Sequence, residues 1–273
     1  MNTQPPITPL QSLAREVFDT LAGQFPVCLA SDEFHFFPHY AAAPRDWSIW
    51  DEFTSARVID IAGRITGWQR QLDHLPLDPA ETVDADMIRR VLTILYEQLT
   101  QVCFHRTQPS FYLTIVSMGL ADAWEAGRHA LRRRVATLPG FLDQIRPNLD
   151  PVPALFRELA LEMIPQLGAW FDRLPVPDKD RIAAAAALQR LAAELRRCPV
   201  REGFILPGNL YARVAARHLG CDMTLGQIAR QLDDEIAATR AELDRMAARM
   251  TPGAPWQVVV EHLPAPEPGD RHP

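Results

Sequence analysis

Lysine is almost missing from this 273-residue chain. Of its 28 basic residues only Lys179 is a lysine, and acidic residues outnumber basic ones, which gives a formal net charge of -6. Proteins that bind nucleic acids or membrane surfaces in a general way are usually basic. We therefore expect neither a nucleic acid nor a membrane among the partners of this chain.

Long apolar runs are missing as well. A membrane-spanning helix needs about 18 or more consecutive apolar residues, and no segment approaches that length. Residues 1–9 are polar and proline-rich, with no apolar run behind a basic start, so we expect no secretory signal. The four cysteines are scattered and form no CxxC pair. Together these features predict a cytoplasmic protein with reduced thiols.

The common catalytic motifs are also missing. No histidine precedes a glutamate, which excludes the His-Glu-x-x-His zinc helix. The lone lysine lies between Asp178 and Asp180, which excludes a phosphate-binding Gly-Lys-Ser/Thr loop. Neither a Gly-x-Ser-x-Gly elbow nor a Gly-x-Gly-x-x-Gly turn occurs. No cofactor follows from any motif, and the sequence gives no positive indication of an enzyme.

Helical periodicity, in contrast, runs through most of the chain. Apolar residues recur at intervals of three and four, the pattern of amphipathic helices. The apolar stripes run over Leu10–Leu21, Val58–Leu75, Met87–Val102, Leu155–Trp170 and Ile182–Leu195. The longest one starts behind a Thr224/Gln227 capping box and ends at Met250. Residues 257–261, with three valines, form the one credible strand.

These patterns predict an all-α fold, an antiparallel multi-helix bundle. An aromatic, proline-broken loop spans residues 27–53 near the N-terminus. We expect a single helical domain over residues 1–250. A proline-rich tail, or an arm that binds a partner, would follow over residues 251–273.

One polar cluster is a candidate for chemistry. Asp32, Glu33, His35 and His39 place two carboxylates and two imidazoles within eight residues of an aromatic segment. These side chains could hold a metal such as zinc or exchange protons. Pro38 interrupts the helix that would align the two histidines. The alternative is a buried loop whose polar residues cap their neighbours.

A run of arginines is a second candidate. Arg128, Arg132 and Arg133 lie in a basic segment that could contact an anion or an acidic partner. Glu125 lies three residues before Arg128 and four before His129, and this spacing instead favours a solvated helix face. Cys103 and His105 are two positions apart and do not face each other on a helix, so a nucleophile–base pair is not favoured there.

The order of several short segments resembles a known bacterial family. The segments are 30–34 (ASDEF), 74–78 (HLPLD), 108–113 (QPSFYL), 138–142 (LPGFL), 146–149 (RPNL) and 223–228 (MTLGQI). Over residues 20–260 this succession is similar to the N-terminal half of the family called domain of unknown function 885. Members of that family look like helical zinc metallopeptidases distantly related to carboxypeptidase Taq.

The resemblance implies a helical scaffold that lacks the family's zinc ligands. The family's zinc motif lies in the C-terminal half, and nothing in this sequence matches those ligands. The implied function is a non-catalytic scaffold or accessory subunit that acts with a protein partner, such as a metallopeptidase-like chain that would supply any zinc. Two alternatives stay open: a metal-dependent, hydrolase-like enzyme with a site near residues 32–40, and a protein that binds a small ligand or peptide. A homo-oligomer is compatible with each.

Overall fold

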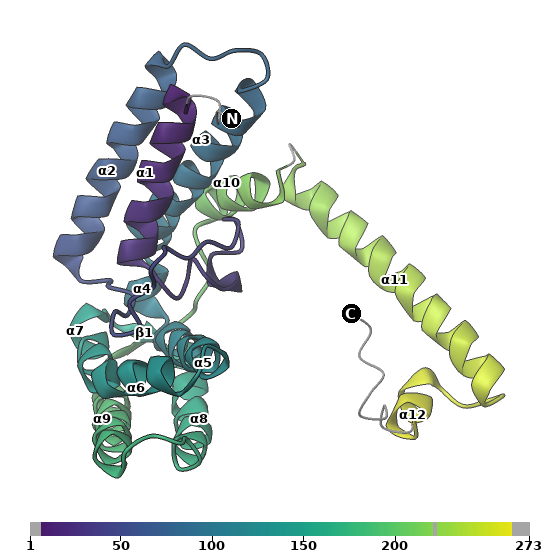
Figure 1. Cartoon of the computed structure of the whole chain (residues 1–273). Helices are drawn as coiled ribbons and strands as arrows, with labels where there is room; N and C mark the ends of the chain where they lie inside the picture. The colour runs from purple at the N-terminus through teal and green to yellow at the C-terminus, as the bar shows by residue number, and fades with distance from the viewer. Residues whose placement is uncertain (1–6, 221–222, 264–273) are drawn as a thin grey trace, which may run out of the picture. The chain divides into compact units, whose positions relative to one another are not determined.

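The computed structural model describes residues 7–220 and 223–263, which are almost entirely helical (Figure 1). The predicted all-α class is confirmed. The chain divides into two compact units, residues 1–218 and 219–273. This division precedes the last long helix, whereas the boundary expected from the sequence, after residue 250, follows it. In the described ranges no helix is long and apolar enough to cross a membrane.

Three helices form one layer of the first unit: α1 (Pro9–Gln24), α2 (Ser55–His74) and α3 (Thr82–Glu97). In Figure 1 they lie next to one another at the N-terminal end of the fold, and α2 packs on both of the others. The Thr8 side chain caps α1 in a box with Gln11, so that the helix starts where the sequence predicts. The stripe from Leu10 to Leu21 is buried, again as predicted.

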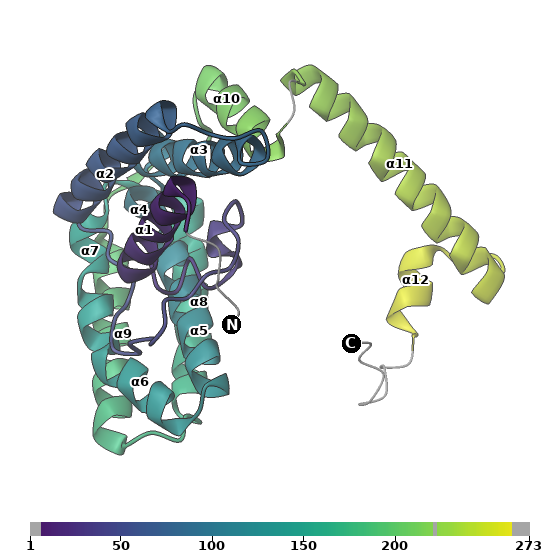
Figure 2. The same cartoon turned by 45° about the horizontal axis from the view of Figure 1, so that its top comes forward.

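Four further helices form a closed bundle: α5 (Pro109–Glu125), α6 (Arg128–Asp143), α8 (Ala154–Phe171) and α9 (Asp178–Arg197). Helix α5 packs on α6 and α8, and α9 packs on the same two (Figures 1 and 2). Each of the four helices therefore has two neighbours, which is the arrangement of a four-helix bundle.

Short elements connect these layers. They are η1 (Asp32–Phe34), the π-helix η2 (Gln98–Val102), α4 (Phe104–Thr107), α7 (Ile145–Asn148), β1 (Val152–Pro153), β2 (Val200–Arg201) and α10 (Gly208–Leu219). The two strands pair in parallel, with Pro153 opposite Arg201. The π-helix ends at Cys103, whose φ of 53° lies in the left-handed region. Such a conformation is uncommon for a residue with a side chain, and π-turns often occur at functional sites.

The second unit consists of α11 (Leu225–Met250) and α12 (Trp256–Glu261). The Thr224 capping box at the start of α11 is confirmed. The strand expected at 257–261 is wrong, because these residues form α12. The amides of Val258 and Val259 bond to the carbonyl of Pro255, and Val259 is buried. In the described residues no strand lies beside this segment to pair with it. The backbone N–H and C=O groups therefore form hydrogen bonds within a helix, although valine favours strands.

The apolar stripe of α8 differs from the one expected. The structure buries Ala160, Ile164 and Phe171, and leaves Leu155 and Leu159 at 50% and 43% exposure. Leu167 is common to both stripes. The buried face is rotated because α5 and α9 both pack against the small Ala160 side of the helix. Tertiary packing, not the row of leucines, sets which face is inside.

Candidate functional site

The structure divides the polar cluster that the sequence pointed to. His39 Nε2 donates to Asp32 Oδ1 over 2.6 Å, and both side chains are exposed. The ring of His35 instead meets His218 on α10, with 3.1 Å between His35 Nε2 and His218 Nδ1. In the described ranges no three His, Cys, Asp or Glu side chains are grouped so that they could hold a metal ion.

Glu33 belongs to neither pair and is half-buried. Burial raises the pKa of its carboxyl, and the nearby charges of Asp51 and Asp32 raise it further. Glu33 and His35 both line one cavity, whereas Asp32 and His39 do not. Glu33 and His35, which share a cavity with His218 of α10, are therefore the members of the cluster that lie at a candidate site.

Two neighbouring cavities of the first unit form the candidate site, called here the double cavity. The smaller one measures about 180 Å³ and is lined by the following polar and apolar side chains: Glu33, Phe34, His35, Phe36, Gln98, Val102, Phe104, Gln108, Phe111 and His218. The larger one measures about 430 Å³ and is lined by Val102, Thr107, Gln108, Phe156, Arg201, Phe204, Ile205, Leu206 and Tyr211. Val102 and Gln108 line both, so the two cavities share a wall. The larger cavity has the size and apolar character that are typical of small-molecule sites.

Both ring nitrogens of His218 are engaged at the polar end of the double cavity. Gln98 Nε2 lies 3.0 Å from His218 Nε2, and His35 lies at the other nitrogen. Burial, followed by the charge of His35, lowers the pKa of His218. A neutral ring that accepts a hydrogen bond at Nε2 from the Gln98 amide and donates one from Nδ1 to His35 Nε2 satisfies both contacts. The π-helix places Gln98 toward this histidine.

An ion pair on a buried carboxylate holds α10 in place. The side chain of Glu97 is 6% exposed and accepts from Arg213 Nε at 2.9 Å, and Arg217 also contacts it. Arg90 donates to the carbonyls of Arg217 and His218 at the last turn of α10. A cation at the end of a helix satisfies its free carbonyls. These contacts fix the helix that carries Tyr211 and His218 into the double cavity.

The arginine run lies on an exposed helix face, apart from one buried member that was not expected. Arg128 and Arg132 are exposed, and Arg133 pairs with Asp46 at 3.1 Å. Arg134, the next residue, is fully buried. Its guanidinium lies 4.8 Å from the ring centroid of Trp50, and it donates to a backbone carbonyl. The run therefore presents a solvated face and one interior cation, and Arg128, Arg132 and Arg133 line neither part of the double cavity.

A buried aspartate organises the segment between α1 and α2. Asp51 accepts from the amides of Val27 and Cys28 at 2.8 and 3.1 Å. Burial raises its pKa to about 6, although these bonds and Arg134 oppose the shift. Burial of the Cys28 thiol raises its pKa, and the negative charge of Asp51 beside it raises the pKa further. This thiol is thus an unreactive core residue. The sequence pattern predicted neither Asp51 nor Arg134 as a buried charged residue.

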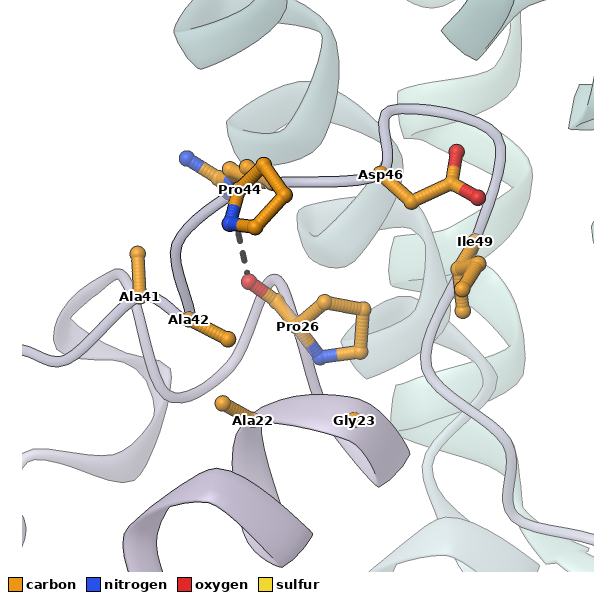
Figure 3. Close-up of a pocket in the computed structure, with 9 residues that line it drawn as sticks. Ala22, Gly23, Pro26, Ala41, Ala42, Pro44, Asp46 and Ile49 are labelled. Carbon is orange, nitrogen blue, oxygen red and sulfur yellow. Dashed lines mark hydrogen bonds between the residues drawn. The ribbon is translucent and has the colours of Figure 1, made fainter. Parts of the chain in front are cut away.

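Figure 3 shows a smaller cavity, of about 120 Å³, between the end of α1 and the segment that follows it. Small side chains such as Ala22, Ala41 and Ala42 form most of its wall. Its arginine is already engaged, because Arg45 donates to the Pro26 carbonyl over 3.2 Å and pairs with Asp122 at 2.5 Å. This cavity has the character of a packing gap.

Helix α11 carries a second surface of interest, called here the α11 stripe. It consists of the apolar residues Leu225, Ile228, Leu232, Ile236, Leu243, Met246 and Met250. Within its own unit the helix packs on α12 alone, and Ala247 is its one buried residue. Leu232, Ile236, Met246 and Met250 are between 48% and 58% exposed. Exposed apolar surface of this extent marks interaction sites.

Comparisons with known proteins give the fold and no activity. No protein-family model matches the chain, and no curated protein does. A solved structure of a provisionally assigned lipoprotein of unknown function from Shewanella oneidensis matches with a TM-score of 0.60 and 16% sequence identity. The match covers 96% of this chain and 50% of that one. The chain thus spans about half the length of that structure, and at this identity the likeness concerns the fold alone.

Proposed function

We propose that this protein is a non-catalytic helical scaffold that binds a partner protein through the α11 stripe. The observation that carries the proposal is the apolar face of α11 that its own unit leaves uncovered. A helix of 26 residues is about 39 Å long, and its own unit supplies the six residues of α12 as cover. Helices gain most of their stability from packing of an apolar face.

The chemistry of the partner follows from the shape of the stripe. Apolar residues at intervals of three and four match a second amphipathic helix laid along the first. The solved structure that shares this fold contains about as much further polypeptide as the matched half. The family resemblance suggests a metallopeptidase-like chain as the partner. A binding role has more support than hydrolysis, because the polar cluster at residues 32–39 is divided between two sites.

The test compares two variants of the same helix. Leu232→Glu with Ile236→Glu places two charges on the stripe, four residues apart. Ala237→Glu with Ala241→Glu places the same charges at the same spacing on the exposed opposite face. The tagged chains capture partners from source cells, mass spectrometry identifies any stoichiometric protein, and that protein is purified and titrated calorimetrically against each variant.

We expect a partner that binds the wild type and the Ala237/Ala241 variant equally. Binding to the Leu232/Ile236 variant should be at least about a hundredfold weaker, since two apolar side chains of about 1.5 kcal/mol or more each are lost. Equal binding of both variants, or a monomer by light scattering that captures nothing, would overturn the proposal. A wild-type dimer broken by the stripe variant alone would replace the partner with a second copy of this chain.

A further inference from the structure

The larger cavity has an apolar body that the fold leaves open. Phe156 on α8 and Phe204 after β2 meet edge to face, with ring centroids 5.9 Å apart. Phe204, Ile205 and Tyr211 are 53%, 87% and 52% exposed around this cavity. Large apolar side chains in contact with water at a cavity of about 430 Å³ gain free energy when an apolar group replaces that water.

The same cavity contains one cation. Arg201 lies on β2, and its position is fixed by the parallel pairing with Pro153 on β1. In the described part of the chain its guanidinium takes part in no ion pair, unlike Arg106 and Arg213, which are held by carboxylates. A guanidinium matches a carboxylate with two parallel hydrogen bonds. One such group beside aromatic walls suits a ligand with one negative charge.

We propose that the larger cavity binds an apolar monocarboxylate, an organic acid with an aromatic or branched aliphatic body. The carboxylate would pair with Arg201, and the body would pack between Phe156, Phe204 and Tyr211. Val102 and Gln108 also line the smaller, more polar cavity, which therefore adjoins the larger one. A longer ligand would there meet the amides of Gln98 and Gln108 and the ring of His218. This inference is independent of the α11 stripe, which contributes no residue to the double cavity.

A titration with small probes tests the assignment. The full chain is titrated with 3-phenylpropionate, with 4-methylpentanoate and with 3-phenylpropionamide, which keeps the aromatic body and lacks the charge. Arg201→Gln removes the cation, and Arg196→Gln on the exposed last turn of α9 is the matched control. Phe204→Ser removes an aromatic wall from an exposed position, so that the fold is preserved; circular dichroism checks this.

We expect both carboxylates to bind the wild type and the Arg196→Gln variant at least tenfold more tightly than the amide. Arg201→Gln should abolish that preference and leave the affinity for the amide unchanged. Phe204→Ser should weaken all three probes. The assignment fails if the amide binds as well as the acid, if Arg201→Gln and Arg196→Gln behave alike, or if none of the probes binds the wild type at millimolar concentration.

Discussion

The buried carboxylate of Glu97 gives the sharpest test of how the double cavity is built. Glu97→Gln keeps the size of the side chain and removes its charge. The carboxylate is 6% exposed and holds Arg213 and Arg217, both on α10. Because α10 carries Tyr211 and His218, loss of these pairs should loosen one wall of each cavity.

The size of the effect follows from burial. Hydrogen bonds to a charged group contribute about 1.5–3 kcal/mol each, but the two arginines are 42% and 39% exposed, and water screens part of this. We expect Glu97→Gln to lower the free energy of unfolding of α10 by about 2–3 kcal/mol. The matched control is Glu242→Gln, which breaks the exposed pair with Arg245 and should cost less than about 1 kcal/mol.

Hydrogen exchange measured along the chain is the suitable assay, because a two-unit chain need not unfold in one step. The amides of residues 208–219 should exchange about 30-fold or more faster in the Glu97→Gln variant, the equivalent of about 2 kcal/mol. Protection in α5 and α6 should change little. Equal effects of Glu97→Gln and Glu242→Gln, or an α10 that is unaffected, would refute the role given to this carboxylate.

Two further predictions concern the core. Gly119→Ala should destabilise the first unit by about 1–3 kcal/mol in denaturant unfolding, because the added Cβ would lie 2.8 Å from Trp50 Cζ3 and 3.0 Å from Val27 Cγ2; Gly140→Ala, with nothing within 4 Å, should stabilise it by up to about 1 kcal/mol, and the reverse order would contradict the packing described. Burial lowers the pKa of His105 to about 4, below its unfolded value of about 6.5. The stability from this neutral ring is therefore present above about pH 6.5 and is lost as the pH falls to 4, a loss of about 3 kcal/mol that His105→Phe should remove. Parallel pH–stability curves for wild type and variant would rule out this role of His105. Asp51, whose pKa is raised to about 6, changes stability with pH in the opposite direction. Because Asp51 is present in both proteins, its contribution cancels in the difference between the two curves.

The helices were predictable because the signals that specify them are local. Apolar spacing and capping residues act within a few turns, so that the Thr8 and Thr224 capping boxes identify the starts of α1 and α11 directly. The phase of a helix depends on its neighbours as well, and the leucines of α8 pointed to the wrong face for that reason.

The candidate site was less predictable because its parts are distant in the chain. Glu33 and His35 were predicted from the sequence and do line a cavity. The partner of His35, however, is His218, which is 183 positions away in the chain. Arg201 and Phe204 carry no local signal of a cavity. Arg134 could have been found: it follows Ala130 by four positions and precedes Leu138 by four, and so lies on the buried face of α6. The general rule that arginines are exposed hid it.

The most direct test of the scaffold account is hydrogen exchange in α11 of the purified chain, with and without the identified partner. The account predicts weak protection of residues 228–240 in the chain alone, since α12 is the element of its own unit that packs on this helix. The partner should slow their exchange at least about tenfold, or about 1.4 kcal/mol. Strong protection of these residues without any partner, or no change when the partner binds, would contradict the account.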